Sequence, residues 1–331
     1  MSTRIVARRA VACAILAALA APAVQATESI FADTYLVDTQ PAGGHEFEQW
    51  FINKRGKASG EYNEWYLRSE VEFGITDKLQ IAPYVNVRAQ NVYRTTADGR
   101  TEADYVPEDF SYDHPFERYR KTQFDSVSAE VIYRFTSPVT DALGVALYVE
   151  PSIGPRFREL EARLLLQKNL VDDRLILAGN LGVELEDKKK TGVPGQIVIP
   201  GEGPEEGEGD GDDDEGDVLL VPRWDRSTEV IGRFGASYLF APRWRVGAEL
   251  SGFMEYEGRT LSSSKREHLT WFFGPTIAYA DQHFFFSATL EHQMPWAKVY
   301  EDEYAAEKIG GRLYANERER NVFTFKFGMP F

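Results

Sequence analysis

The chain has 331 residues, with 37 Lys and Arg side chains against 52 Asp and Glu side chains, so its formal net charge is −15 at pH 7. This charge excludes non-specific nucleic-acid binding, because the phosphate backbone repels an acidic chain. The length allows either two soluble domains or one large barrel. The periodicity of the apolar residues must therefore decide the fold class.

The amino terminus predicts export. Three arginines in the first nine positions precede an apolar stretch at 10–21, and small residues follow up to Ala26. This order is typical of a secretory signal peptide. We therefore assign residues 1–26 to a cleaved signal peptide and residues 27–331 to the exported protein. No later stretch reaches the roughly 20 apolar residues of a membrane helix.

Twelve segments of the exported chain alternate apolar and polar residues, which is the two-residue period of a β-strand. In the clearest one, Leu67, Val71 and Phe73 share one face, while Arg68 and Glu70 share the other. This pattern predicts an all-β, antiparallel up-and-down transmembrane barrel, for which an even strand number is expected. The predicted strands are 44–53, 63–75, 79–88, 122–135, 143–156, 160–169, 175–186, 227–240, 244–256, 268–280, 283–293 and 321–331.

The connections between these strands alternate in length. Tight turns follow the second, fourth, sixth, eighth and tenth strands, whereas long polar segments follow the third, seventh and eleventh. Short periplasmic turns and longer extracellular loops are typical of outer-membrane barrels. Aromatic residues with lipid-facing parity lie beside the short turns and predict a periplasmic girdle. They are Phe73, Tyr133, Phe135, Tyr238, Phe240, Trp244, Tyr279, Phe284 and Phe331.

The last predicted strand carries large apolar residues at alternate positions, including Phe327 and the terminal Phe331. It resembles the C-terminal assembly signal of Gram-negative outer-membrane barrels, which ends in an aromatic residue. The resemblance implies that the barrel assembly machinery inserts the chain into the outer membrane, with its lipids and lipopolysaccharide as partners. The alternative interpretation is the final strand of a secreted β-sandwich.

The hairpin from Glu70 to Gln80 is the second diagnostic stretch. An acidic residue, an apolar residue and a glycine lead into a short turn, and Leu79-Gln80 follows it. This hairpin resembles one found in several uncharacterised Gram-negative barrel families that are grouped loosely with transporters. The resemblance implies a porin-like channel for an unknown small solute, although fold alone does not fix function.

Charged residues of both signs have inward parity. They either pair across strands and fill a narrow barrel, or they line a polar path and select a solute. The candidate lumen residues are Arg68, Glu70, Glu72, Arg88, Glu130, Arg134, Glu150, Arg156, Glu161, Arg163, Glu184, Glu186, Glu229, Arg233, Arg245, Glu249 and Lys326.

The longest interruption, at about 187–222, is predicted to be a disordered acidic extracellular loop, because its glycines and carboxylates have nothing apolar to bury. It lacks the ligand spacing of a calcium loop, so only weak cation association is expected. An alternative is that it plugs the lumen by pairing with Arg88, Arg156 or Arg233.

Two alternative functions remain: a lipid-active enzyme of the outer membrane, and a structural or adhesive barrel. His268 is the best candidate for a catalytic base, with the serines at 262–264 near it in sequence. Triads are recognised by geometry and not by sequence position, so this signal is weak. The only cysteine, Cys13, lies in the signal peptide. We therefore expect no enzyme activity, no cofactor and no metal site.

Overall fold

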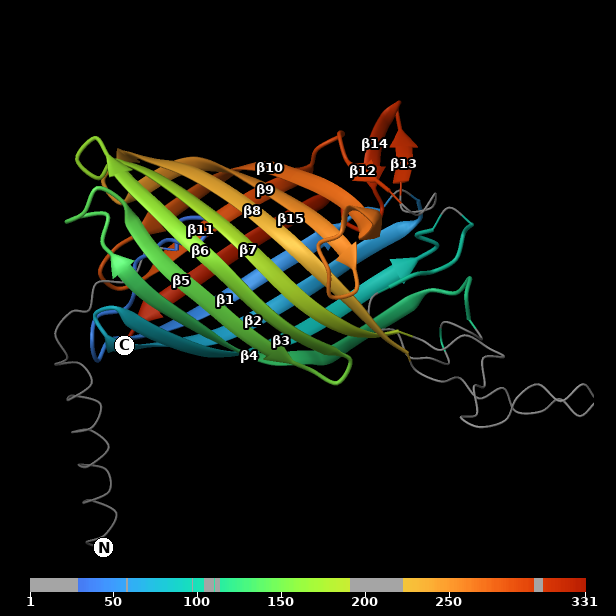
Figure 1. The fold of residues 1–331 in the computed structure, drawn as a ribbon, viewed down its shortest axis with the longest axis horizontal. Coiled ribbons are helices and arrows are strands. Elements are labelled where there is room, and N and C mark those ends of the chain that lie inside the picture. Colours follow the sequence, from blue (N-terminus) through green and yellow to red (C-terminus); the bar gives the residue numbers. More distant parts are fainter. Residues whose placement is uncertain are drawn as a thin grey trace, which may run out of the picture.

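The structure is a computed structural model that describes residues 29–331 except 58, 97, 104–109, 111–113, 191–222 and 301–305. Across the described residues, twelve antiparallel strands close into one barrel, because β15 pairs with both β1 and β11 (Figure 1). The barrel strands are β1 (His45–Arg55), β2 (Glu61–Thr76), β3 (Leu79–Tyr93), β4 (Tyr119–Thr136), β5 (Gly144–Ile153), β6 (Phe157–Leu170), β7 (Leu175–Lys190), β8 (Arg223–Ala241), β9 (Trp244–Glu257), β10 (Arg266–Ala280), β11 (Phe285–Gln293) and β15 (Asn321–Pro330).

All twelve predicted strands are confirmed, and most of them are longer than predicted. In β15, Phe323 and Met329 are exposed on the outside, whereas Thr324 and Lys326 are buried inside. Apolar residues outside and polar residues inside are the arrangement of a membrane-spanning barrel, because lipid solvates the outer face. One predicted lumen residue, Arg156, lies in the turn after β5 and not within a strand, because Gly154 and Pro155 end that strand early.

The short turns gather at one end of the barrel, together with many of the predicted girdle aromatics. Tyr133 contacts Phe135 with ring centroids 5.1 Å apart, and Trp244 contacts Tyr279 at 5.1 Å. The ring of Phe331 stacks on His45 at the start of β1. These contacts lie where the sequence predicts the periplasmic end.

The opposite end carries the longer connections. They include η1 (Ser263–Lys265), the short strand β12 (Lys298–Val299), which pairs with β10, and the hairpin of β13 (Ala306–Ile309) and β14 (Arg312–Ala315). The predicted signal peptide and residues 191–222 of the predicted acidic loop lie outside the described residues. No helix in the described part of the chain is long and apolar enough to cross a membrane.

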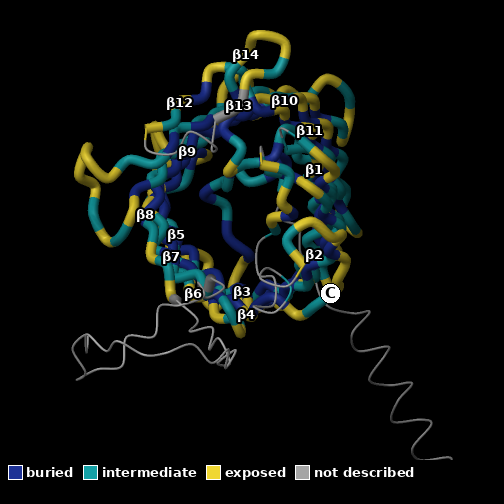
Figure 2. Tube along the Cα trace, turned by 90° about the vertical axis from the view of Figure 1, so that its right-hand side faces the viewer, coloured by how far each residue is buried: buried dark blue, intermediate teal, exposed yellow. Residues whose placement is uncertain are grey.

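The segment that precedes β1, residues 29–44, lies inside the barrel. Figure 2 shows buried chain within the ring of strands, and Phe31, Val37 and Gln40 are at most 1 % exposed. The sequence analysis predicts no place for this segment, which we call the inner segment.

Candidate functional site: the barrel lumen

The inner segment enters and leaves at the short-turn end. Ile30 packs with Ile176 and Ala278, both close to short turns. At its other end, the N–H of Gly43 donates to the carbonyl oxygen of Gly74 at 2.8 Å. Between these points the segment reaches toward the middle of the barrel, so it occupies lumen space at the short-turn end.

Lumen side chains form hydrogen bonds with the backbone N–H and C=O groups of the inner segment. Asn180 accepts from the N–H of Tyr35 at 2.7 Å and donates to its carbonyl oxygen at 2.9 Å. Gln167 accepts from the N–H of Val37 at 2.9 Å, and Gln80 accepts from that of Gln40 at 2.8 Å. Buried backbone N–H groups need such partners, so inward amides replace the neighbouring strand that this segment lacks.

Two charged contacts hold the deepest part of the segment. The carboxylate of Glu249 accepts from the backbone N–H groups of Ala32 and Thr34 and from the Thr34 hydroxyl. Asp33 forms ion pairs with Arg163 at 3.2 Å and with Arg233 at 2.5 Å. Arg233, one of the three arginines predicted as possible partners of the acidic loop, is thus paired with the inner segment.

Three inward glycines make room for the segment. A Cβ atom at Gly235 would lie 2.7 Å from the ring of Phe31, and one at Gly144 would lie 2.7 Å from a methyl carbon of Val37. At Gly74 it would lie 2.0 Å from the carbonyl oxygen of Pro41. Glycine is required at these positions because the segment lies against the wall.

Cations and aromatic rings occupy the centre of the lumen. The guanidinium of Arg68 lies 4.3 Å from the ring centre of Trp50 and 4.0 Å from that of Tyr84. The Lys326 ammonium lies 3.4 Å from the Trp50 ring centre. Because the rings hold both cations, their positive charge is stabilised partly by the rings and not only by carboxylates.

The loop between β11 and β15 contacts lumen residues at the end that carries the longer connections. Arg318 forms an ion pair with Glu229, and Lys54 lies 3.5 Å from Glu319. Burial alone would raise the pKa of Glu319, but Lys54 and Lys57 hold it below its ordinary value. Each end of the lumen is therefore covered by chain that is held by charged contacts.

The candidate lumen residues divide by burial. Arg68, Arg134, Arg156 and Arg233 are partly exposed. Arg88 pairs with Glu64 and Asp125, and Arg134 pairs with Asp38. Those that are buried are Glu70, Glu72, Arg88, Glu130, Glu150, Glu161, Arg163, Glu186, Glu229, Arg245, Glu249 and Lys326. Glu184 is half-buried.

The sequence analysis missed Glu46, Glu48 and Glu64, which are all buried. Glu64 was missed because β2 starts two residues earlier than predicted, so its inward position fell at the edge of the predicted strand. Glu46 and Glu48 were missed because adjacent Trp50 and Phe51 blur the alternation of β1, although Trp50 is in fact inward. Continuing the two-residue alternation along β1 and β2 from the positions where it is clear would have found all three residues.

His268 is buried near the end that carries the longer connections, and its Nε2 atom lies 3.6 Å from Glu255. Among the described residues, neither ring nitrogen has a hydrogen-bond partner. The serines at 262–264 are exposed, and Ser262 and Ser264 bond to each other. This geometry does not favour a nucleophile and base pair.

A closed barrel with an apolar exterior and a charged interior defines an integral outer-membrane β-barrel protein. A family model described as "Family of unknown function (DUF6662)" matches residues 23–331. The chain belongs to this family. No curated protein matches the sequence.

Several solved barrels are similar in fold at low identity. The COG4313 outer membrane channel from Pseudomonas putida F1 has a TM-score of 0.46 and 9% identity, over 89% of this chain and 98% of that one. The β domain of the Bordetella autotransporter BrkA has a TM-score of 0.45 and 12% identity, over 87% of this chain and 100% of that one. The Pseudomonas putida toluene transporter TodX has a TM-score of 0.38 and 10% identity, over 93% of this chain and 96% of that one. None of these likenesses indicates a function for this chain.

Proposed function

We propose that this protein is an outer-membrane channel for a small solute, that it favours cations, and that it opens when the inner segment moves out of the lumen. The observation that carries the proposal is the interior itself, which is polar, charged and filled by a segment that is not part of the wall. A segment that lies in the lumen without being part of the wall can leave it, which a plug built from wall side chains cannot do.

The preference for cations follows from the balance of buried charge. Within the described part of the chain, the buried charged residues comprise fourteen acids against four lysines and arginines. Several acids face each other directly across strands, as Glu161 does with Glu150 and with Glu184. Rings of carboxylates favour cations over anions in a narrow pore.

Movement of the inner segment is chemically feasible. Most of its contacts are hydrogen bonds to lumen side chains, and water can replace such partners at small net cost. Its apolar anchors lie in two small clusters around Phe31 and Val37. Both clusters lie near the short turns, so release of the segment requires these two anchors to separate and the contacts of Asp33 and Glu249 to break.

Planar bilayer recordings test the proposal. The purified protein should give discrete conductance steps with a reversal potential that indicates cation preference. Glu249→Ala should weaken that preference and Arg68→Ala should strengthen it, because each removes one inward charge. If neither the wild type nor a variant lacking residues 30–43 gave conductance steps, the result would contradict a channel.

The same preparation separates the two alternatives. A lipid-active enzyme would leave bilayers silent while lipid products accumulate and depend on His268. A structural or adhesive barrel would be silent in both assays. The geometry around His268 gives no specific support to the enzyme.

A further inference from the structure

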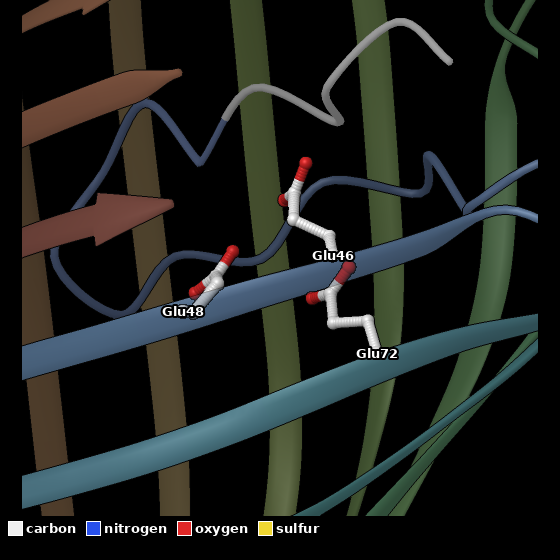
Figure 3. A group of neighbouring side chains, drawn as sticks. All are labelled: Glu46, Glu48 and Glu72. Carbon is white, nitrogen blue, oxygen red and sulfur yellow. The ribbon is translucent and has the colours of Figure 1, made fainter. Parts of the chain in front are cut away.

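Five buried carboxylates meet on one side of the lumen. Glu46 and Glu48 project from β1, and Glu72 projects from the neighbouring strand β2 toward the same space (Figure 3). Oxygen atoms of these three residues lie within 4.8 Å of one another. A second such triad, Glu70, Glu72 and Glu130, shares Glu72. We call these five residues the acidic chamber.

The strand register makes this arrangement costly without a counter-ion. Glu46 lies directly opposite Glu72, and Glu48 lies directly opposite Glu70. Like charges at directly opposed positions destabilise a sheet, and burial in low dielectric increases their repulsion. Two consecutive inward pairs of this kind therefore require positive charge or protons between them.

The neighbouring cations meet this requirement only in part. Arg68 Nη1 is 3.9 Å from Glu70 Oε2, which is too far for a hydrogen bond, and the guanidinium lies over two aromatic rings. Lys326 donates to Ser29 at 3.0 Å and lies over Trp50. Neither cation therefore donates a hydrogen bond to Glu70.

A cavity opens beside these carboxylates, between the inner segment and the barrel wall. Asp38, Glu48, Glu70, Glu72 and Glu130 line it, against a single lysine, Lys326. The cavity has a volume of about 50 Å³, which is room for an ion with a few water molecules, because one water needs about 10–15 Å³.

Glu70 points independently to a ligand. Its side chain is 1 % exposed, and neither of its carboxylate oxygens has a hydrogen-bond partner among the described residues. A buried carboxylate without a partner costs free energy. A cation in the cavity that Glu70 lines would supply that partner.

A third acidic triad, Glu159, Glu161 and Glu184, is a weaker candidate. Arg163 already bonds to both carboxylate oxygens of Glu161. The charge of that triad is therefore partly neutralised within the protein.

We propose that the acidic chamber binds a divalent cation, and specifically Ca²⁺, through Glu70, Glu72 and Glu130, with Glu48 and water completing the coordination. Hard carboxylate oxygens are the ligands that Ca²⁺ takes, at about 2.3–2.6 Å. Two ligands on opposite sides of one such ion are about 5 Å apart, which accommodates the spacing of this triad. Mg²⁺ requires a tighter octahedron and should bind more weakly.

Terbium luminescence gives a direct test, because Tb³⁺ replaces Ca²⁺ and emits when a nearby tryptophan is excited. Trp50 lines the same cavity. The full-length protein in detergent, freed of metal by a chelator, should show saturable emission that CaCl₂ removes. Trp50→Phe should strongly reduce the emission, with Tyr35 in the same cavity as the remaining donor, whereas Trp224→Phe, on the outside of β8, should keep it. No saturable emission from the wild type, or equal emission from Trp50→Phe, would overturn the proposal.

A stability measurement tests the ligands. CaCl₂ should raise the thermal unfolding midpoint of the wild type, and NaCl of equal ionic strength should not. Glu70→Gln combined with Glu130→Gln should abolish the rise, while the variant itself folds well because a repulsion has been removed. Glu184→Gln is the matched control in the third triad and should retain the rise. A rise that persists in the double variant, or that Glu184→Gln removes, would contradict the assignment.

The calcium site does not depend on solute passage. Silent bilayers would contradict the proposed channel and leave the luminescence result unaffected. Loss of the calcium response would leave the channel proposal standing.

Discussion

On the outer face of the barrel all exposed side chains meet the same apolar surroundings, whereas on the inner face many polar side chains contact one particular partner. Phe323 and Met329 need only an apolar environment. Glu249, by contrast, accepts hydrogen bonds from residues more than 200 positions away in the chain, such as Thr34. The outer face therefore tolerates exchange among apolar residues, while the inner face depends on particular pairs.

Deleting residues 30–43 should have the largest effect, because it removes the partner of the inner face and leaves the outer face unchanged. Single-channel conductance should rise several-fold. The unfolding free energy should fall, since Ile30, Phe31 and Val37 lose burial worth about 1.5–3 kcal/mol each. The far-ultraviolet circular dichroism spectrum and heat-modifiable migration on gels should persist. Unchanged conductance would show that the inner segment does not block the path.

A wedge at Gly235 should have a smaller effect of the same kind. Gly235→Leu would push into the ring of Phe31, and overpacking of this type costs about 1–3 kcal/mol. Conductance should lie between those of the wild type and the deletion. Gly232→Leu is the matched control on the same strand, since a Cβ there meets nothing within 4 Å. Equal behaviour of the two variants would contradict the packing described.

A change on the outer face should alter assembly more than conductance. Phe331 stacks on His45 with ring centroids 5.7 Å apart, and its N–H donates to the carbonyl oxygen of His45 at 3.0 Å. Phe331→Ala should lower the amount of folded barrel in the outer membrane, and periplasmic material should be degraded. Met329→Ala, on the same face, should have a weaker effect. Unchanged levels on immunoblots of Phe331→Ala would show that the C-terminal strand is not the assembly signal.

The smallest expected effect lies in the turn between β10 and β11, which belongs to neither face. Backbone N–H groups of His283 and Phe284 donate to Asp281 and hold its pKa below the ordinary value. A carboxyl group whose pKa is lower in the folded than in the unfolded protein stabilises the fold at pH values above its unfolded pKa of about 4. This stabilisation is lost as the pH falls through the pKa of the folded state. Asp281→Asn should therefore lower the unfolding midpoint slightly at pH 7 and have no effect near pH 2. An equal difference at both pH values would contradict this assignment.

The sequence predicted the strands of the barrel, but it did not predict the inner segment or the acidic chamber within the lumen. The two-residue period located all twelve strands, because the outer face requires only apolar residues at alternate positions. It could not place the inner segment, which is too short and irregular to show a period and is held by side chains from distant strands, such as Asn180, Gln167 and Glu249. The acidic chamber was missed for a related reason. Its members come from three strands, and register alone brings Glu46 and Glu72 together.

The most direct test of the central claim is a reversible lock on the inner segment. The sequence has no cysteine after Cys13, so Val37→Cys with Gly144→Cys introduces a thiol pair at a point where the inner segment and the wall touch. The oxidised variant should give silent bilayers, and a reductant added to the same bilayer should restore conductance steps, whereas Val37→Cys alone should not respond. Equal conductance before and after reduction, with the disulfide confirmed by mass spectrometry, would contradict the claim that solute passage requires this segment to move.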